Sequence, residues 1–81
     1  MTESKYQAKL IKEHEAKGYY VMKLLKTNKN GIPDLLALKD NEKPLFIEVK
    51  KKGGITSALQ KFRIKELKSH GFNAIVDEAL N

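Results

Sequence analysis

The sequence predicts an α/β fold in which two helices flank a mixed four-stranded sheet. Two segments rich in helix-forming residues each end at a glycine, three short apolar segments lie between them, and a fourth follows the second helix. This order of helix, three strands, helix and strand predicts one sheet with helices packed on it. The chain shows no linker, repeat or low-complexity tract, so we expect residues 1–81 to form a single domain.

The first helix is predicted over residues 3–17. Its residues are good helix formers, Thr2 is a suitable N-cap, and Gly18 is the kind of residue at which a helix ends. Side chains spaced by three and four residues define the face expected to turn toward the sheet: Gln7, Leu10, Ile11 and His14. One turn earlier this face reaches Glu3, which predicts a carboxylate directed at the sheet.

Three strands are predicted in the middle of the chain, over residues 19–25, 35–38 and 45–50. All three segments are short and rich in apolar, branched or aromatic residues. Residues 26–31 contain asparagine and glycine and predict a polar loop, and Pro33 is tolerated because it lies at a strand entrance. The short connection between the second and third strands predicts an antiparallel hairpin.

The second helix is predicted to begin after an N-cap at Thr56 or Ser57 and to run to about His70, where Gly71 closes it. Its inward face is expected to carry Gln60, Ile64 and Leu67, with Phe62 beside them. Residues 72–76 predict a fourth strand, which after a helix is expected to run parallel to an earlier strand. The last five residues carry no prediction.

The charge of the chain points to a polyanionic partner. Sixteen lysine and arginine residues against ten acidic residues give a formal net charge of +6. The basic residues cluster at Lys50, Lys51 and Lys52 and along the second helix at Lys61, Arg63, Lys65 and Lys68. This pattern favours nucleic acid over a membrane surface, because no helix joins a basic face to a bulky aromatic and leucine face.

The chain contains no cysteine, so it holds neither a disulfide nor a thiolate zinc site. No segment has the apolar core of a secretory signal or the length of a membrane span. These features predict a soluble protein located in the cytoplasm.

Three charged residues interrupt the two most apolar strands and form the candidate active site. Glu48 and Lys50 alternate with apolar residues, so they share one face of a strand and lie about 7 Å apart. Asp34, at the entrance of the preceding strand, can be brought beside Glu48 by hairpin pairing. Two carboxylates next to an ammonium group suit Mg²⁺, and the backbone carbonyl of Val49 offers a further oxygen ligand. This constellation predicts hydrolysis of phosphodiester bonds.

A structural role without catalysis remains an alternative for each of these residues. A Glu-x-Lys pair such as Glu48 and Lys50 is usually an exposed ion pair. Asp34 can instead be a turn residue, because aspartate beside glycine and proline is often found in turns. Gln60 can be a helix-surface amide, and Glu3 can serve only the helix dipole. His14 is better explained as a packing or surface residue than as a general base.

At these residues the chain resembles the PD-(D/E)XK nuclease superfamily, with Pro33-Asp34 followed by Glu48-Val49-Lys50 on adjacent strands. Within it the chain looks most like the virus-type replication-repair nucleases, the VRR-NUC family, from residue 3 to about residue 76. The resemblance implies a compact restriction-endonuclease-like αβββαβ core. It also implies metal binding by Asp34 and Glu48, a catalytic Lys50, a supporting Gln60 and an acidic residue on the first helix, best matched by Glu3.

The resemblance further implies a Mg²⁺- or Mn²⁺-dependent DNA endonuclease. Small members of this family and similar junction resolvases act as homodimers on branched DNA, which favours a Holliday-junction resolvase. A flap or single-strand nuclease, and a nucleic-acid-binding module without turnover, are the alternatives. Contacts with phosphates beside the scissile bond are expected from Lys51, Lys52 and Lys61.

Overall fold

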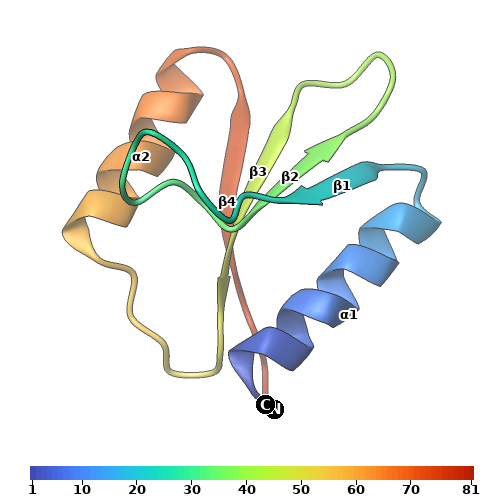
Figure 1. Cartoon of the computed structure of the whole chain (residues 1–81), viewed down its shortest axis with the longest axis vertical. Coiled ribbons are helices and arrows are strands. Elements are labelled where there is room, and N and C mark those ends of the chain that lie inside the picture. Colours follow the sequence, from blue (N-terminus) through green and yellow to red (C-terminus); the bar gives the residue numbers. More distant parts are fainter.

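The computed structural model describes residues 1–81 and confirms the predicted α/β fold. Its mixed sheet has the strand order β1-β2-β3-β4, with two antiparallel pairs followed by one parallel pair. The two helices and the sheet are consistent with a restriction-endonuclease-like core (Figure 1). The elements are α1 Glu3–Ala16, β1 Tyr20–Lys23, β2 Leu35–Leu38, β3 Leu45–Lys50, α2 Ala58–Ser69 and β4 Asn73–Glu78. Neither helix has the length and apolar character needed to cross a membrane.

Helix α1 begins as the sequence predicts. The Thr2 hydroxyl accepts a hydrogen bond from the Lys5 amide at 3.1 Å, which satisfies one of the free donors of the first turn. The helix ends at Ala16, one residue before the predicted end, and Gly18 then takes the left-handed conformation at a φ of 91°. Leu10 is buried at the centre of the inward face.

Strand β1 is shorter than predicted. It pairs with β2 only from Tyr20 opposite Leu38 to Lys23 opposite Leu35, because β2 offers four residues for pairing. The prediction was therefore wrong at both ends of residues 19–25. The chain leaves the sheet after Lys23, and the side chain of Leu25 is 86 % exposed.

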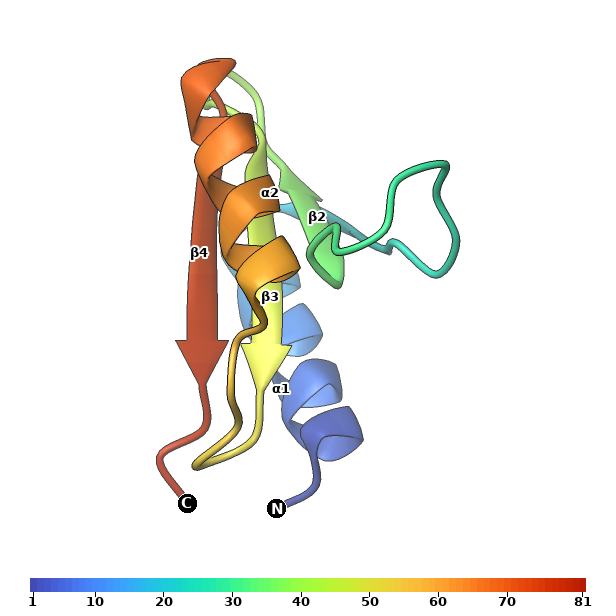
Figure 2. The same ribbon diagram turned by 90° about the vertical axis from the view of Figure 1, so that its left-hand side faces the viewer.

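Strands β2 and β3 have the predicted bounds and form an antiparallel hairpin. Alternating residues of β3 face opposite sides of the sheet. Ile47 and Val49 join Leu10, Leu35 and Ala37 in the buried core beneath α1. Glu48 and Lys50 face the other side, where α2 lies, and Figure 2 shows the two helices on opposite sides of the sheet.

Helix α2 begins with a capping box that selects Ser57 rather than Thr56 as the N-cap. The Ser57 hydroxyl accepts from the Gln60 amide at 3.1 Å, and the Gln60 side chain accepts from the Ser57 amide at 2.9 Å. The prediction that Phe62 lies beside the inward face was wrong, since 54 % of its surface is exposed. Two residues advance an α-helix by about 200°, so Phe62 points away from the side that carries Gln60.

Strand β4 begins one residue later than predicted and extends two residues further, through Glu78. It runs parallel to β3, as expected, from Asn73 opposite Leu45 to Glu78 opposite Lys50. Ala79 is buried after the strand, and its amide donates to the carbonyl of Lys50 at 2.9 Å. The last residues of the chain, which carried no prediction, therefore help to hold the end of β3.

Candidate active site

The hairpin brings the predicted acidic residues together at one end of the sheet. Leu35 pairs with Ile47, so Asp34, one residue earlier, lies across from Glu48. The Val49 amide donates to Asp34 Oδ2 at 2.8 Å, and this bond continues the β2–β3 pairing through a side chain. Asp34 is thus a strand-entrance residue that contacts β3.

Glu48 is the most deeply buried charged residue of the chain, with 2 % of its surface exposed. Its Oε2 atom lies 3.2 Å from Lys50 Nζ and accepts a hydrogen bond from Gln60 Nε2 at 2.9 Å. A buried carboxylate needs such partners, because its transfer from water is costly. The structure therefore joins three predicted site residues, from β3 and α2, at a single oxygen.

The electrostatic environment of Glu48 is unfavourable to its negative charge. Burial raises the pKa of the Glu48 carboxyl, and the neighbouring charge of Asp34 raises it further. Lys50 lowers the pKa through its hydrogen bond and charge, Glu3 raises it slightly, and the net direction is upward. Burial and the neighbouring carboxylates thus disfavour the charged form of Glu48 more than Lys50 favours it.

The second oxygen of Glu48, Oε1, is buried and has no hydrogen-bond partner. An unsatisfied buried acceptor costs about 1–3 kcal/mol, and either a hydrogen-bond donor or a cation would remove this cost. A divalent cation that prefers oxygen ligands fits both this unpartnered atom and the neighbouring carboxylate of Asp34. The residues present are therefore chemically suited to Mg²⁺ or Mn²⁺.

The structure does not gather three or more metal-ligating side chains into one cluster. Asp34 and Glu3 use carboxylate oxygens to accept hydrogen bonds from the amides of Val49 and Lys51, at 2.8 Å and 3.3 Å. Coordination of an ion by Asp34, Glu48, Glu3 and the Val49 carbonyl stays a prediction.

Helix α1 places Glu3 at the end of β3, as its position on the inward face predicts. One turn later, the Tyr6 hydroxyl donates to Asp77 Oδ1 and connects α1 to β4. This hydrogen bond, together with partial burial, raises the pKa of Tyr6 to about 12. Sequence reasoning missed this pair. The spacing of Tyr6 from Glu3 was the only available signal, and Asp77 lies in the segment without a prediction.

The predicted phosphate-contacting lysines are all exposed: Lys51, Lys52 and Lys61. Lys51 and Lys52 follow β3 in a loop that is fastened by Glu78, which accepts from the Gly53 amide at 3.1 Å. The loop is thus held at its start by Glu3 and at its turn by Glu78. This arrangement leaves the lysine side chains open to a bound polyanion, and the role of Glu78 was not foreseen.

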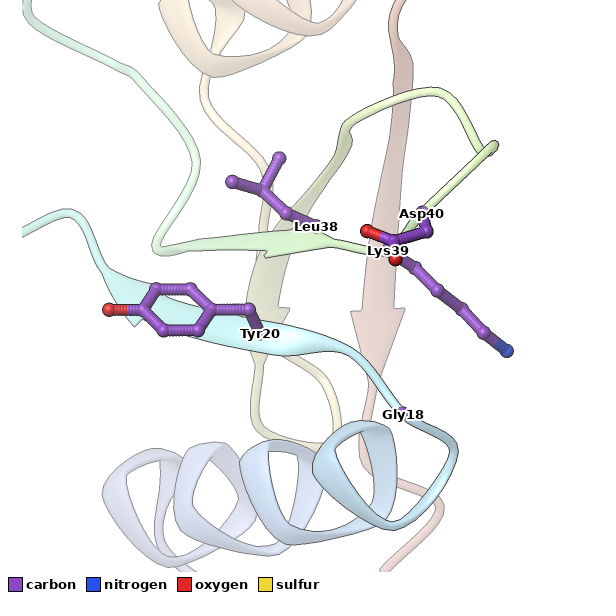
Figure 3. Close-up of a pocket in the computed structure, with 5 residues that line it drawn as sticks. All are labelled: Gly18, Tyr20, Leu38, Lys39 and Asp40. Atoms are coloured by element: carbon purple, nitrogen blue, oxygen red, sulfur yellow. The ribbon is translucent and has the colours of Figure 1, made fainter.

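A shallow hollow elsewhere on the molecule is not part of this site. It is lined by Gly18, Tyr20, Leu38, Lys39 and Asp40 (Figure 3). Tyr20 and Leu38 pair where β1 begins and β2 ends, whereas Asp34 lies at the opposite end of β2. The hollow contains no counterpart of the Glu48 cluster.

The family model for the VRR-NUC domain matches residues 1–79 of the chain. No curated protein and no solved structure matches it. The matched residues run from α1 through β4 and include every residue of the candidate site. The chain therefore belongs to the VRR-NUC family and is a nuclease of the PD-(D/E)XK type.

Proposed function

We propose that this nuclease is a Mg²⁺- or Mn²⁺-dependent endonuclease that hydrolyses phosphodiester bonds in DNA. The observation that carries the proposal is the state of Glu48. One of its oxygens is held by Lys50 and Gln60, while the other is buried without a partner. A purely structural ion pair has no reason to keep a buried acceptor unsatisfied. A cation site, by contrast, keeps such an oxygen free to bind the ion.

Each residue has a distinct part in this chemistry. Asp34 and Glu48 would hold the ion, with Glu3 and the Val49 carbonyl as further oxygen ligands. The ion, when bound, neutralises phosphate charge and lowers the pKa of bound water. Lys50 orients the nucleophile and stabilises negative charge that develops at phosphorus.

Gln60 has a positioning part in the same site. Its amide donates to Glu48 Oε2 at 2.9 Å and fixes the direction of that carboxylate. Because the same side chain caps α2, the orientation of Glu48 is coupled to the start of the helix.

The preferred substrate in this proposal is a four-way junction cut by a homodimer. Two copies related by a twofold axis present two equal sites, which suits paired cuts in a symmetric branched substrate. Support for self-association comes from edge strand β1, where Tyr20 and Met22 are 69 % and 37 % exposed. The net charge of +6 supports binding to a large polyanion.

The proposal is tested by offering labelled four-way junction, flap, single-strand and linear duplex DNA in parallel, with Mg²⁺, Mn²⁺ or EDTA. Asp34→Asn and Lys50→Ala should abolish cleavage. Asp40→Asn and Lys43→Ala, which change the same residue types in the exposed β2–β3 turn, should leave it intact. Measurement of the solution mass reports the dimer.

Symmetric nicks in the junction that need the metal would support the full proposal. Preference for flaps or single strands would refute the four-way junction as the substrate and would still support metal-dependent hydrolysis. Full activity of Asp34→Asn or Lys50→Ala would refute the mechanism. Salt-dependent DNA binding without any metal-dependent cleavage would indicate a binding module instead.

A further inference from the structure

We propose that residues 24–33, called the arm below, bind the backbone of the DNA that flanks the scissile phosphate. This inference rests on the proposed function. The arm projects away from the sheet between β1 and β2 (Figure 2, teal to green). Its two ends meet where the Leu24 amide donates to the carbonyl of Asp34 at 2.8 Å. Both ends of the arm therefore lie next to Asp34, a residue of the candidate active site.

The length of the arm exceeds what the fold requires. Strands β1 and β2 are antiparallel neighbours, and a connection of about 2–5 residues is enough to join such a pair. Pro33, near the end of the arm, is buried, whereas residues 25–30 are exposed, and no residue of the arm belongs to the sheet. Loops of this kind on a rigid scaffold commonly carry binding residues.

The shape of the arm is fixed by contacts within it and with α2. Thr27 Oγ1 donates to the Lys29 carbonyl at 2.6 Å and accepts from the Lys29 amide at 3.2 Å. Arg63 of α2 donates from Nε to the Asn30 carbonyl at 2.8 Å. Because α2 also carries Gln60, one helix positions both the Glu48 carboxylate and the arm.

Close packing fastens the arm to α2 at a second point. Gly31 has a φ of 81°, and a Cβ atom at this position would lie 2.7 Å from Leu59 Cγ. Only glycine allows this backbone to approach the helix so closely. The arm is therefore held in one place, which lowers the entropy cost of binding a ligand.

The chemistry of the arm fits a phosphate backbone. Lys26 and Lys29 are exposed, and neither forms an ion pair. The arm contains no other charged residue, so its two lysines give it a net positive charge. Positive charges on a fixed loop suit contact with phosphates.

The test compares two double variants of equal charge. Lys26→Gln with Lys29→Gln alters the arm, and Lys12→Gln with Lys43→Gln removes two exposed lysines from α1 and the β2–β3 turn. Binding of labelled junction and duplex DNA is followed by fluorescence anisotropy in EDTA over a range of salt. Each lost phosphate contact lowers the salt slope by about 0.9, so loss of two weakens binding by up to about 60-fold at 0.1 M salt. The control should change the Kd much less.

A third variant separates position from charge. Arg63→Lys keeps the charge but loses the planar donor that holds Asn30. It should raise the Kd while leaving the salt slope unchanged, and thermal unfolding verifies that the variant is folded.

Equal weakening by both double variants would overturn the proposal, as would wild-type protein that binds no DNA. A wild-type protein that binds through the arm but never cuts with Mg²⁺ or Mn²⁺ would refute the nuclease chemistry and leave the arm supported. Cleavage that is insensitive to the arm variants at limiting DNA would refute the arm and leave the chemistry.

Discussion

Replacing Gln60 tests two roles of this side chain, the capping of α2 and the orientation of the Glu48 carboxylate. The side chain accepts from the Ser57 amide in the capping box and donates to Glu48 Oε2. Gln60→Ala removes both bonds, whereas Ser57→Ala removes only the other half of the capping box, the bond from the Gln60 amide to Ser57 Oγ. Gln60→Glu keeps an oxygen that can accept from Ser57 but turns an acceptor toward Glu48.

The expected energies follow from these contacts. Loss of the Ser57 cap costs about 1 kcal/mol. Gln60→Ala loses its own capping bond, worth about 0.5–1.5 kcal/mol, and a bond to a charged group, worth about 1.5–3 kcal/mol. The free energy of unfolding should therefore fall by about 2–4 kcal/mol in Gln60→Ala, and the urea midpoint should report the difference from Ser57→Ala.

Activity should divide the variants more sharply than stability. A group that orients a metal ligand typically contributes about 10- to 100-fold to metal affinity or activity. Gln60→Ala should raise the metal concentration for half-maximal cleavage by that factor, and Gln60→Glu should do so despite an intact cap. Ser57→Ala should remain within about threefold of wild type, since it leaves the Glu48 contact in place.

The assay is cleavage of a labelled junction across a Mg²⁺ titration, at a temperature where all variants are folded. If Gln60→Ala and Ser57→Ala required the same metal concentration, Gln60 would be only a helix cap. Wild-type metal dependence in Gln60→Glu would refute the positioning argument as well.

Two further changes test the contacts that hold the elements around the site. Tyr6→Phe should lower the free energy of unfolding by about 1–3 kcal/mol, because the bond to the Asp77 carboxylate is lost. The pKa of Tyr6 is raised from 10.0 to about 12. Its stabilising effect is therefore full below pH 10 and lost as the pH rises through 12, and the wild-type and variant urea midpoints should converge there; a constant difference would contradict the assignment. Gly31→Ala should destabilise by about 2–4 kcal/mol through backbone strain and overlap with Leu59. Leu59→Ala should recover part of this loss, and strictly additive midpoint shifts would show that the two residues do not interact.

Much of the site follows from patterns that are local in the chain. The alternation of residues along a strand places Glu48 and Lys50 on one face, and the Pro33-Asp34 pair marks the entrance of the neighbouring strand. The register of the hairpin then brings Asp34 to Glu48. Helical spacing predicted the direction of Gln60, which does contact Glu48. These relations hold because strand and helix periods are set by backbone geometry alone.

The prediction for Phe62 was wrong because its apolar character suggested a place beside the inward face, whereas helical spacing turns it about 200° from Gln60. Sequence periodicity also could not predict the ends of β1, because the length of a strand depends on how many residues its partner strand offers. Tyr19, Leu24 and Leu25 have the composition of a strand but find no partner in β2.

The contacts that arrange the site join residues far apart in the sequence. Tyr6 meets Asp77, Arg63 meets the carbonyl of Asn30, and Glu78 meets the amide of Gly53. These pairings cannot be predicted from local sequence patterns. Each partner comes from another element, and the placement of that element depends on how the whole core packs. Local backbone geometry thus specifies how the candidate site residues are arranged, while the contacts that hold the arm and the lysine loop form only once the helices and the sheet have come together.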